Sequence, residues 1–193
     1  MKGKTKKSIL VLVLLLAIGF AAVTTTLTIN GTIRLGANQE NFKDNLIFTK
    51  AELTYSDDVS TTVEEGENAT ISGDGKSISF TTRTLKNIGS VATLTYDITN
   101  NSQYTAEFTG ITCAVTNNDG TDVTDAVKAN TEYITLDAKD FTTETGNIKI
   151  KPTEKVEGHT LNVAMRKSFV GDETTNTTQY TITCTINASG LSE

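Results

Sequence analysis

A regular alternation of apolar and polar residues constrains the fold of this chain more than any other feature. In residues 92–98, threonines and an aspartate separate Ala92, Leu94, Tyr96 and Ile98. Successive side chains of a strand point to opposite faces of a sheet, so this spacing predicts a strand with one buried face. After the polar residues 100–102, a second alternating run changes parity at Gly110, which predicts a β-bulge. The two runs predict long strands that form either a hairpin or a corner between sheets.

Other alternating runs occupy most of the remaining chain, separated by polar turns. They include residues 25–35, 46–55, 77–82, 133–136, 148–151, 161–165 and 180–186. Gly31 is the candidate position for another bulge, and Gly73-Asp74-Gly75-Lys76 predicts a hairpin turn. After residue 24 no helical period extends over ten residues. About eight to ten short strands predict an all-β protein with one β-sandwich, in immunoglobulin-like or jelly-roll order.

The first 24 residues have the composition of an export signal. Four lysines precede an uninterrupted run of 15 apolar residues, from Ile9 to Val23. A membrane span needs about 20 residues, so the run matches a signal peptide better, although its small residues do not form a clean Ala-x-Ala cleavage site. The alternative is an uncleaved N-terminal helix that contacts the membrane through residues 8–23. Either way, residues 25–193 are expected to form a domain that is secreted or held on the extracellular face of the membrane.

The charge balance argues against a nucleic-acid partner. The chain has 17 basic and 23 acidic residues; without the lysines of the first 24 residues, 13 basic residues remain against 23 acidic ones, a formal charge of −10. An acidic chain repels a phosphate backbone and an anionic lipid surface. Nothing in the sequence implies a cofactor or a small-molecule substrate.

The sequence does not contain a convincing catalytic constellation. His159 is the sole histidine and follows Glu157-Gly158, which predicts a solvent-exposed turn residue. No His-Glu-x-x-His or Gly-x-Ser-x-Gly pattern is present, so the protein is not expected to be an enzyme, and a peptidase is a distant third hypothesis.

Two acidic stretches are interpreted as solvated loops, with calcium binding left open. One contains Asn117, Asp119, Asp122 and Asp125, whose spacing does not fit an EF-hand. The other contains Asp57, Asp58, Glu64, Glu65 and Glu67.

Cys113 and Cys184 both lie at positions of core parity in predicted strands. In an exported chain, a disulfide between them would close a loop of about 70 residues and stabilise the fold by roughly 4 kcal/mol. The alternative is two buried free thiols that act as small apolar side chains.

Several motifs resemble those of small exported proteins of Gram-positive bacteria that have no assigned function. They are Ile78-Ser-Phe80, the turn from Leu85 to Gly89, Leu94-x-Tyr96-x-x-x-Asn100 and Tyr104-x-Ala106. Residues 85–101 are also similar, more distantly, to the Leu-Lys-Pro-Gly-Asp…Asn-Asn-Gly segment of the TasA/camelysin family. Asn87-Ile88 stands where that family has a proline, and Ser90 where it has an aspartate.

This second resemblance implies a β-sandwich or jelly-roll that forms biofilm-matrix fibres, and it directs attention to residues 25–35. A strand beside a cleavage site could leave its own domain and complete the sheet of a neighbouring copy, with its apolar side chains filling pockets there. Those side chains are Leu27, Ile29, Ile33 and Leu35. The alternative is that the strand pairs only within its own sandwich. The expected function is a non-catalytic surface or matrix protein, either a homo-oligomer or fibre subunit or, alternatively, a membrane-tethered adhesion or accessory module.

Overall fold

A computed structural model describes residues 26–37, 42, 45–56, 69–83, 85, 88–143, 146–167 and 177–191. The protein belongs to the all-β class, and its described part contains one short helix, α3 (Thr124–Lys128). The expected signal or anchor in residues 1–24 lies outside the described residues.

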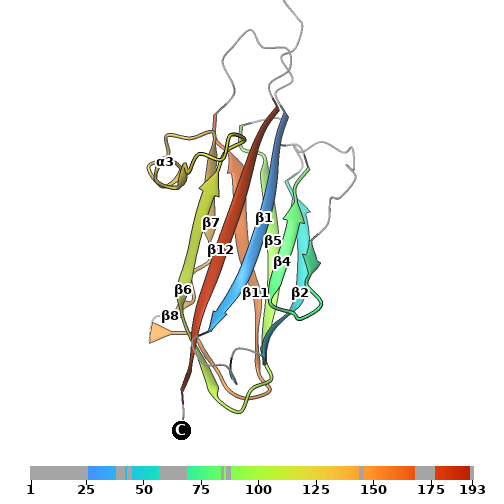
Figure 1. The fold of residues 1–193 in the computed structure, drawn as a ribbon, viewed down its shortest axis with the longest axis vertical. Helices are drawn as coiled ribbons and strands as arrows, with labels where there is room; N and C mark the ends of the chain where they lie inside the picture. Colours follow the sequence, from blue (N-terminus) through green and yellow to red (C-terminus); the bar gives the residue numbers. More distant parts are fainter. Residues whose placement is uncertain are drawn as a thin grey trace, which may run out of the picture.

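Six strands form the larger sheet. Their order is β10 (Lys149–Ile150), β6 (Thr105–Thr116), β12 (Thr177–Leu191), β1 (Thr26–Ala37), β4 (Ser77–Thr81) and β3 (Thr70–Ile71). β1 runs parallel to β12, and every other neighbouring pair in this sheet is antiparallel. Figure 1 shows the first and last strands side by side along the long axis of the molecule.

The second sheet contains four antiparallel strands, and a small hairpin lies apart from both sheets. The four are β2 (Leu46–Tyr55), β5 (Val91–Asn100), β11 (Lys155–Met165) and β7 (Ile134–Ala138), in that order across the sheet. The hairpin joins β8 (Thr142–Thr143) to β9 (Gly146–Asn147). In Figure 1, β5 and β11 pass behind β1 and β12.

Alternate residues of both sheets meet in a single core. In β5 the even-numbered residues are buried and the odd-numbered ones half-buried. Leu161, Val163 and Met165 of β11 and Tyr180, Ile182 and Ile186 of β12 are also buried. These side chains belong to one apolar cluster, so the period of two in the sequence marks the faces on which the sheets contact each other.

The chain changes sheet between β5 and β6, so the predicted hairpin or corner is a corner. Asn100, the last residue of β5, is completely buried and organises this turn. Its Nδ2 donates to the carbonyls of Tyr104 (2.8 Å) and Ile150 (3.0 Å). Its Oδ1 accepts from the Ser102 amide (3.0 Å) and hydroxyl (2.6 Å).

One predicted bulge is confirmed and the other is wrong. Gly110 pairs with Asn187 while Phe108 pairs with Ala188, so Thr109 is the extra residue, and Gly110 has a φ of 134° that favours glycine. At Gly31 the pairing of β1 with β12 continues without interruption, and Phe80 packs in the space where a side chain would lie. The predicted hairpin at residues 73–76 is confirmed by the pairing of β3 with β4.

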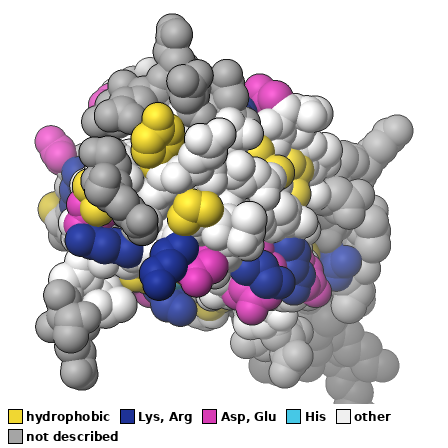
Figure 2. All heavy atoms as spheres, turned by 90° about the horizontal axis from the view of Figure 1, so that it is seen from below, with side chains coloured by type: hydrophobic (Ala, Val, Ile, Leu, Met, Phe, Trp, Pro, Cys, Tyr) yellow, Lys and Arg dark blue, Asp and Glu magenta, His cyan; other side chains and the backbone are white. Residues whose placement is uncertain are grey.

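Charged side chains of both signs are interspersed on the surface. Seen from below, Lys or Arg and Asp or Glu side chains adjoin along one side of the molecule (Figure 2). Ion pairs join Lys50 to Glu52 (3.1 Å) and Lys149 to Glu107 (3.3 Å). This view therefore contains no extended surface of one charge.

Candidate functional site

The structure places the two predicted features, the cysteines and the first strand, next to each other. Cys113 of β6 lies opposite Cys184 of β12, and Cys184 lies opposite Ile33 of β1. Ile33 in turn lies opposite Ile78 of β4. A continuous row of four side chains therefore crosses the larger sheet on its buried face.

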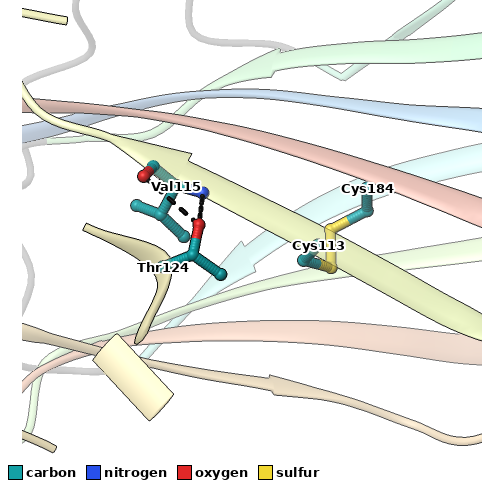
Figure 3. Close-up of a disulfide and its surroundings, with 4 residues drawn as sticks. All are labelled: Cys113, Val115, Thr124 and Cys184. Carbon is teal, nitrogen blue, oxygen red and sulfur yellow. Dashed lines mark hydrogen bonds between the residues drawn. A yellow bond between two sulfur atoms is a disulfide. The ribbon is translucent and has the colours of Figure 1, made fainter. Parts of the chain in front are cut away.

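Cys113 and Cys184 form a disulfide within the sheet, as one of the two sequence interpretations predicted (Figure 3). Their Cα atoms are 4.0 Å apart, which is typical of the narrow, non-hydrogen-bonded pairs of an antiparallel ladder. Cys184 is completely buried, whereas Cys113 is half-buried. The bridge thus has one enclosed end and one end near the surface.

Cys113, the half-buried end of the disulfide, lines a groove between the edges of the two sheets. The groove has a volume of about 350 Å³, and both apolar and polar residues line it. Ile111, Cys113 and Val115 line it from β6, and Leu136 and Ala138 line it from β7. The groove lies where each sheet has an edge. β7 is the edge strand of the smaller sheet, and β6 is the edge of the larger sheet beyond its short pairing with β10.

Helix α3 and the residue before it close one end of the groove. The Val115 amide donates to Thr124 Oγ1 (2.8 Å) (Figure 3). The Val115 carbonyl also accepts from the Val123 amide (2.9 Å). Val127 and Lys128 also line the groove, and Asp140 lines it too. The groove therefore carries one basic side chain, one acidic side chain and Thr124 beside its apolar residues.

Part of the β6 backbone faces the groove side and has no strand partner among the residues that the structure describes. Cys113 and Cys184 form a narrow pair, in which the N–H and C=O of Cys113 point away from β12. Ile111 lies two residues earlier in the strand, so its N–H and C=O point the same way. The bonds that Val115 makes to residues 123 and 124 have this same outward direction. β10 pairs only with Glu107 and Ala106, so it does not cover this stretch of β6.

The predicted assembly strand is β1, and it lies in the interior of its own sheet. Ile33 is completely buried and Leu35 is 8% exposed. Leu27 and Ile29 lie opposite Thr178 and Tyr180 of β12, and their side chains are outside the described part of the structure. In the single chain, β1 therefore pairs within its own domain, which was one of the two alternatives.

His159 is buried in β11, and its predicted exposed turn position is wrong. It is 2% exposed, and its ring stacks on Phe141 with a centroid distance of 4.2 Å. His159 lies on the same face as Leu161, Val163 and Met165, immediately after a register shift between Val156 and His159. The sequence contained this signal, because His159 has the parity of those apolar residues.

Burial shifts the pKa values of His159 and of the neighbouring Tyr96. It lowers the pKa of His159, and Lys139 lowers it further, while the backbones of Asp140 and Glu157 oppose the shift. Burial also raises the pKa of the neighbouring Tyr96. Neither ring nitrogen of His159 nor the Tyr96 hydroxyl has a hydrogen-bond partner among the described residues. His159 is therefore neutral in the folded protein at pH 7.

The acidic turn after β6 uses its carboxylates locally. Asp119 accepts from the Thr121 amide (2.8 Å) and Asp122 from the Thr124 amide (2.9 Å). Hydrogen bonds from the side chains of the same two threonines, together with these amide bonds, lower the pKa of each carboxyl. Within the described ranges, no three His, Cys, Asp or Glu side chains group as metal ligands. The other acidic stretch, from Asp57 to Glu67, lies outside the described residues.

Comparison with protein-family models, curated proteins and solved structures gives no match to this chain. The resemblances described above therefore depend on the residues quoted for them, and the function has to be argued from β1, the disulfide and the groove.

Proposed function

We propose that this protein is a non-catalytic, exported surface or matrix protein, a β-sandwich whose copies assemble by exchanging β1. The observation that carries the proposal is the position of β1. It pairs with β12 over residues 26–37 and with β4 over residues 30–34, yet it is the first strand of the fold. It can therefore be withdrawn without disturbing the order of the remaining strands.

Exchange would conserve the contacts that β1 makes in the single chain. A withdrawn β1 would expose the facing edges of β12 and β4, and the same strand of a second copy has the side chains to fill that gap. Main-chain pairing would supply affinity, and the buried positions of Ile33 and Leu35 would supply register. Successive exchange in one direction would produce a linear fibre.

The other parts of the proposal have more general support. Two sheets that share one core are typical of a β-sandwich. A disulfide is compatible with an oxidising compartment, as expected after export. The resemblance of residues 85–101 to the TasA/camelysin family favours a matrix role over an enzymatic one.

Deletion of residues 25–35 tests the assembly directly. We expect the shortened chain to be absent from high-mass, SDS-resistant species, and a synthetic peptide of residues 25–35 to bind it and restore its cooperative unfolding. A peptide with Gly31→Val is the matched control, because Phe80 occupies the space its side chain would need. Unchanged high-mass species after the deletion would overturn the proposal.

The alternative function is a membrane-tethered adhesion or accessory module, supported by the apolar run of residues 9–23. In the part of the chain that the structure describes, no helix has the length and apolar character of a membrane span. N-terminal sequencing of protein from its native cell surface distinguishes the two. A start between residues 22 and 26 would favour release and assembly. A start at Met1 or Lys2, with extraction by detergent alone, would favour the membrane-tethered module. The third hypothesis, a peptidase, would be favoured by chelator-sensitive proteolysis by the pure protein.

A further inference from the structure

The two sulfurs of the disulfide differ in what surrounds them. Cys184 is completely buried in β12, and on the side away from Cys113 its neighbour across the sheet is Ile33, which is also completely buried. Cys113 is half-buried and lines the groove between β6 and β7. Figure 3 shows the bridge between the two strands, with Thr124 and α3 on the Cys113 side.

This difference matters because thiol–disulfide exchange is directional. An attacking thiolate approaches one sulfur along the S–S axis, from the side opposite the sulfur that leaves. Because the bridge joins directly opposed residues of β6 and β12, its axis runs across the sheet. Attack on Cys184 would have to come through Ile33. Attack on Cys113 comes from the edge of β6, where no strand of the described part of the chain pairs with Ile111 or Cys113.

We propose that Cys113–Cys184 is a one-way thiol-exchange site, in which thiols of peptides or small molecules enter the groove and modify Cys113 alone. The thiolate sulfur forms a new bond to Sγ of Cys113, and the Cys113–Cys184 bond breaks. Sγ of Cys184 leaves with the electron pair and takes up the proton that the attacking thiol released. The products are a mixed disulfide on Cys113 and a neutral, buried thiol at Cys184.

The groove suits such a reagent. Its volume of about 350 Å³ admits a small thiol or the side chain of a cysteine in a peptide. Lys128 on its lining attracts a thiolate, while Asp140 carries the opposite charge, so the groove does not exclude either a cationic or an anionic thiol. The outward N–H and C=O groups of Ile111 and Cys113, which pair with no described strand, offer hydrogen bonds to an extended peptide that carries the cysteine. This inference is independent of strand exchange by β1.

Trapping of the exchange product in the wild-type chain is the first test. The folded, full-length protein would be treated briefly with the neutral thiol 2-mercaptoethanol, quenched with acid, and mapped by mass spectrometry. The chain contains two cysteines, so the assignment is unambiguous. We expect the mixed disulfide on Cys113 in at least about tenfold excess over Cys184. The proposal would be overturned by adducts shared equally between the two cysteines or found mainly on Cys184. It would also be overturned if no adduct formed unless the protein was unfolded.

Two single variants provide a matched second test, since both lack the bridge. In Cys184→Ser the remaining thiol of Cys113 faces the groove, and in Cys113→Ser the remaining thiol of Cys184 is enclosed. We expect the thiol of Cys184→Ser to react with an aromatic disulfide reagent at least about tenfold faster. Reaction in urea is the control, because unfolding should equalise the two rates. Equal rates in the folded variants would contradict the proposal, and if either variant fails to fold, the wild-type trapping decides.

Discussion

The ring of Phe80 occupies the space that a side chain on Gly31 would need. A Cβ placed on Gly31 would lie 1.8 Å from Cζ of Phe80, far inside contact distance. Gly31 lies in β1 directly opposite Phe80 in β4, and Phe80 is 4% exposed. The ring therefore requires a glycine opposite it and so fixes the register of β1 against β4, whether β1 comes from the same chain or from another copy.

Substitution of Gly31 should loosen β1. Gly31→Ala forces the buried ring of Phe80 to move, and we expect it to lower the free energy of unfolding by about 1–3 kcal/mol in urea denaturation. Gly73→Ala is the matched control, since a Cβ there meets no atom within 4 Å, and it should change stability by less than about 0.5 kcal/mol. In a Phe80→Ala background the cost of Gly31→Ala should largely disappear. A cost that persists would mean that the ring is not the cause.

Removal of the Asn100 side chain should destabilise the corner between the sheets. Asn100→Ala removes four hydrogen bonds in a buried setting and leaves the Ile150 carbonyl without this donor. We expect a loss on the order of 3 kcal/mol in the free energy of unfolding. Asn101→Ala, at the adjacent exposed position, should be nearly neutral. Similar effects from both substitutions would show that the buried amide is not what holds the corner.

Protonation of His159 should weaken the fold below neutral pH. Its pKa in the folded protein lies below the ordinary value of 6.5, so the unfolded chain binds the proton more readily. Stability is therefore complete above pH 6.5 and falls as the pH decreases from there, by at most about 1.4 kcal/mol per pH unit.

The measurement is the free energy of unfolding at pH 7.5 and 5.5, in the wild type and in His159→Phe, which retains a ring to stack on Phe141. We expect the wild type to lose stability over this interval, by no more than about 1.4 kcal/mol, and the variant to lose much less. Asp74, Asp119 and Asp122 have lowered carboxyl pKa values, so their contributions are lost at still lower pH and are common to both proteins. An equal loss in both proteins would exclude His159 as the cause.

Local pattern predicted the strands but not their neighbours. The parity of residues 92–98 and the parity shift at Gly110 depend on residues close in sequence, and both predictions are confirmed by the structure. The parallel pairing of β1 with β12 joins the two ends of the fold, and no local spacing carries that information. The groove depends on the same non-local order, since it arises from β6 and β7 lying at the edges of different sheets.

Gly31 and His159 show where local reasoning failed. Gly31 and Gly110 both interrupt alternating runs, but Gly110 has a backbone conformation that favours glycine, whereas Gly31 makes room for a ring from β4. His159 was assigned to a turn because Gly158 precedes it. Gly158 has a φ of 66° beside the register shift in β11, and the strand continues through it. For Gly31 the deciding contact is the ring of Phe80 from β4, and for His159 it is the ring of Phe141.

The most direct test of strand exchange is a cross-link between β1 and β4. Thr32 lies opposite Ser79. The Leu35 amide donates to the Lys76 carbonyl (3.0 Å), so Leu35 and Lys76 form a hydrogen-bonded pair. Hydrogen-bonded and narrow pairs alternate along an antiparallel ladder, so Thr32 and Ser79, three residues away, form a narrow pair. Cysteines at both positions can therefore form a disulfide wherever β1 is inserted. We would separate the high-mass fraction of oxidised Thr32→Cys/Ser79→Cys protein on a denaturing gel without reductant, with each single variant as the control.

Strand exchange predicts a ladder of covalently joined copies that collapses to monomer on reduction. If β1 pairs only within its own chain, every cross-link will be intramolecular and the protein will run as a monomer before and after reduction. That result, or the lack of any high-mass fraction, would contradict the proposed assembly.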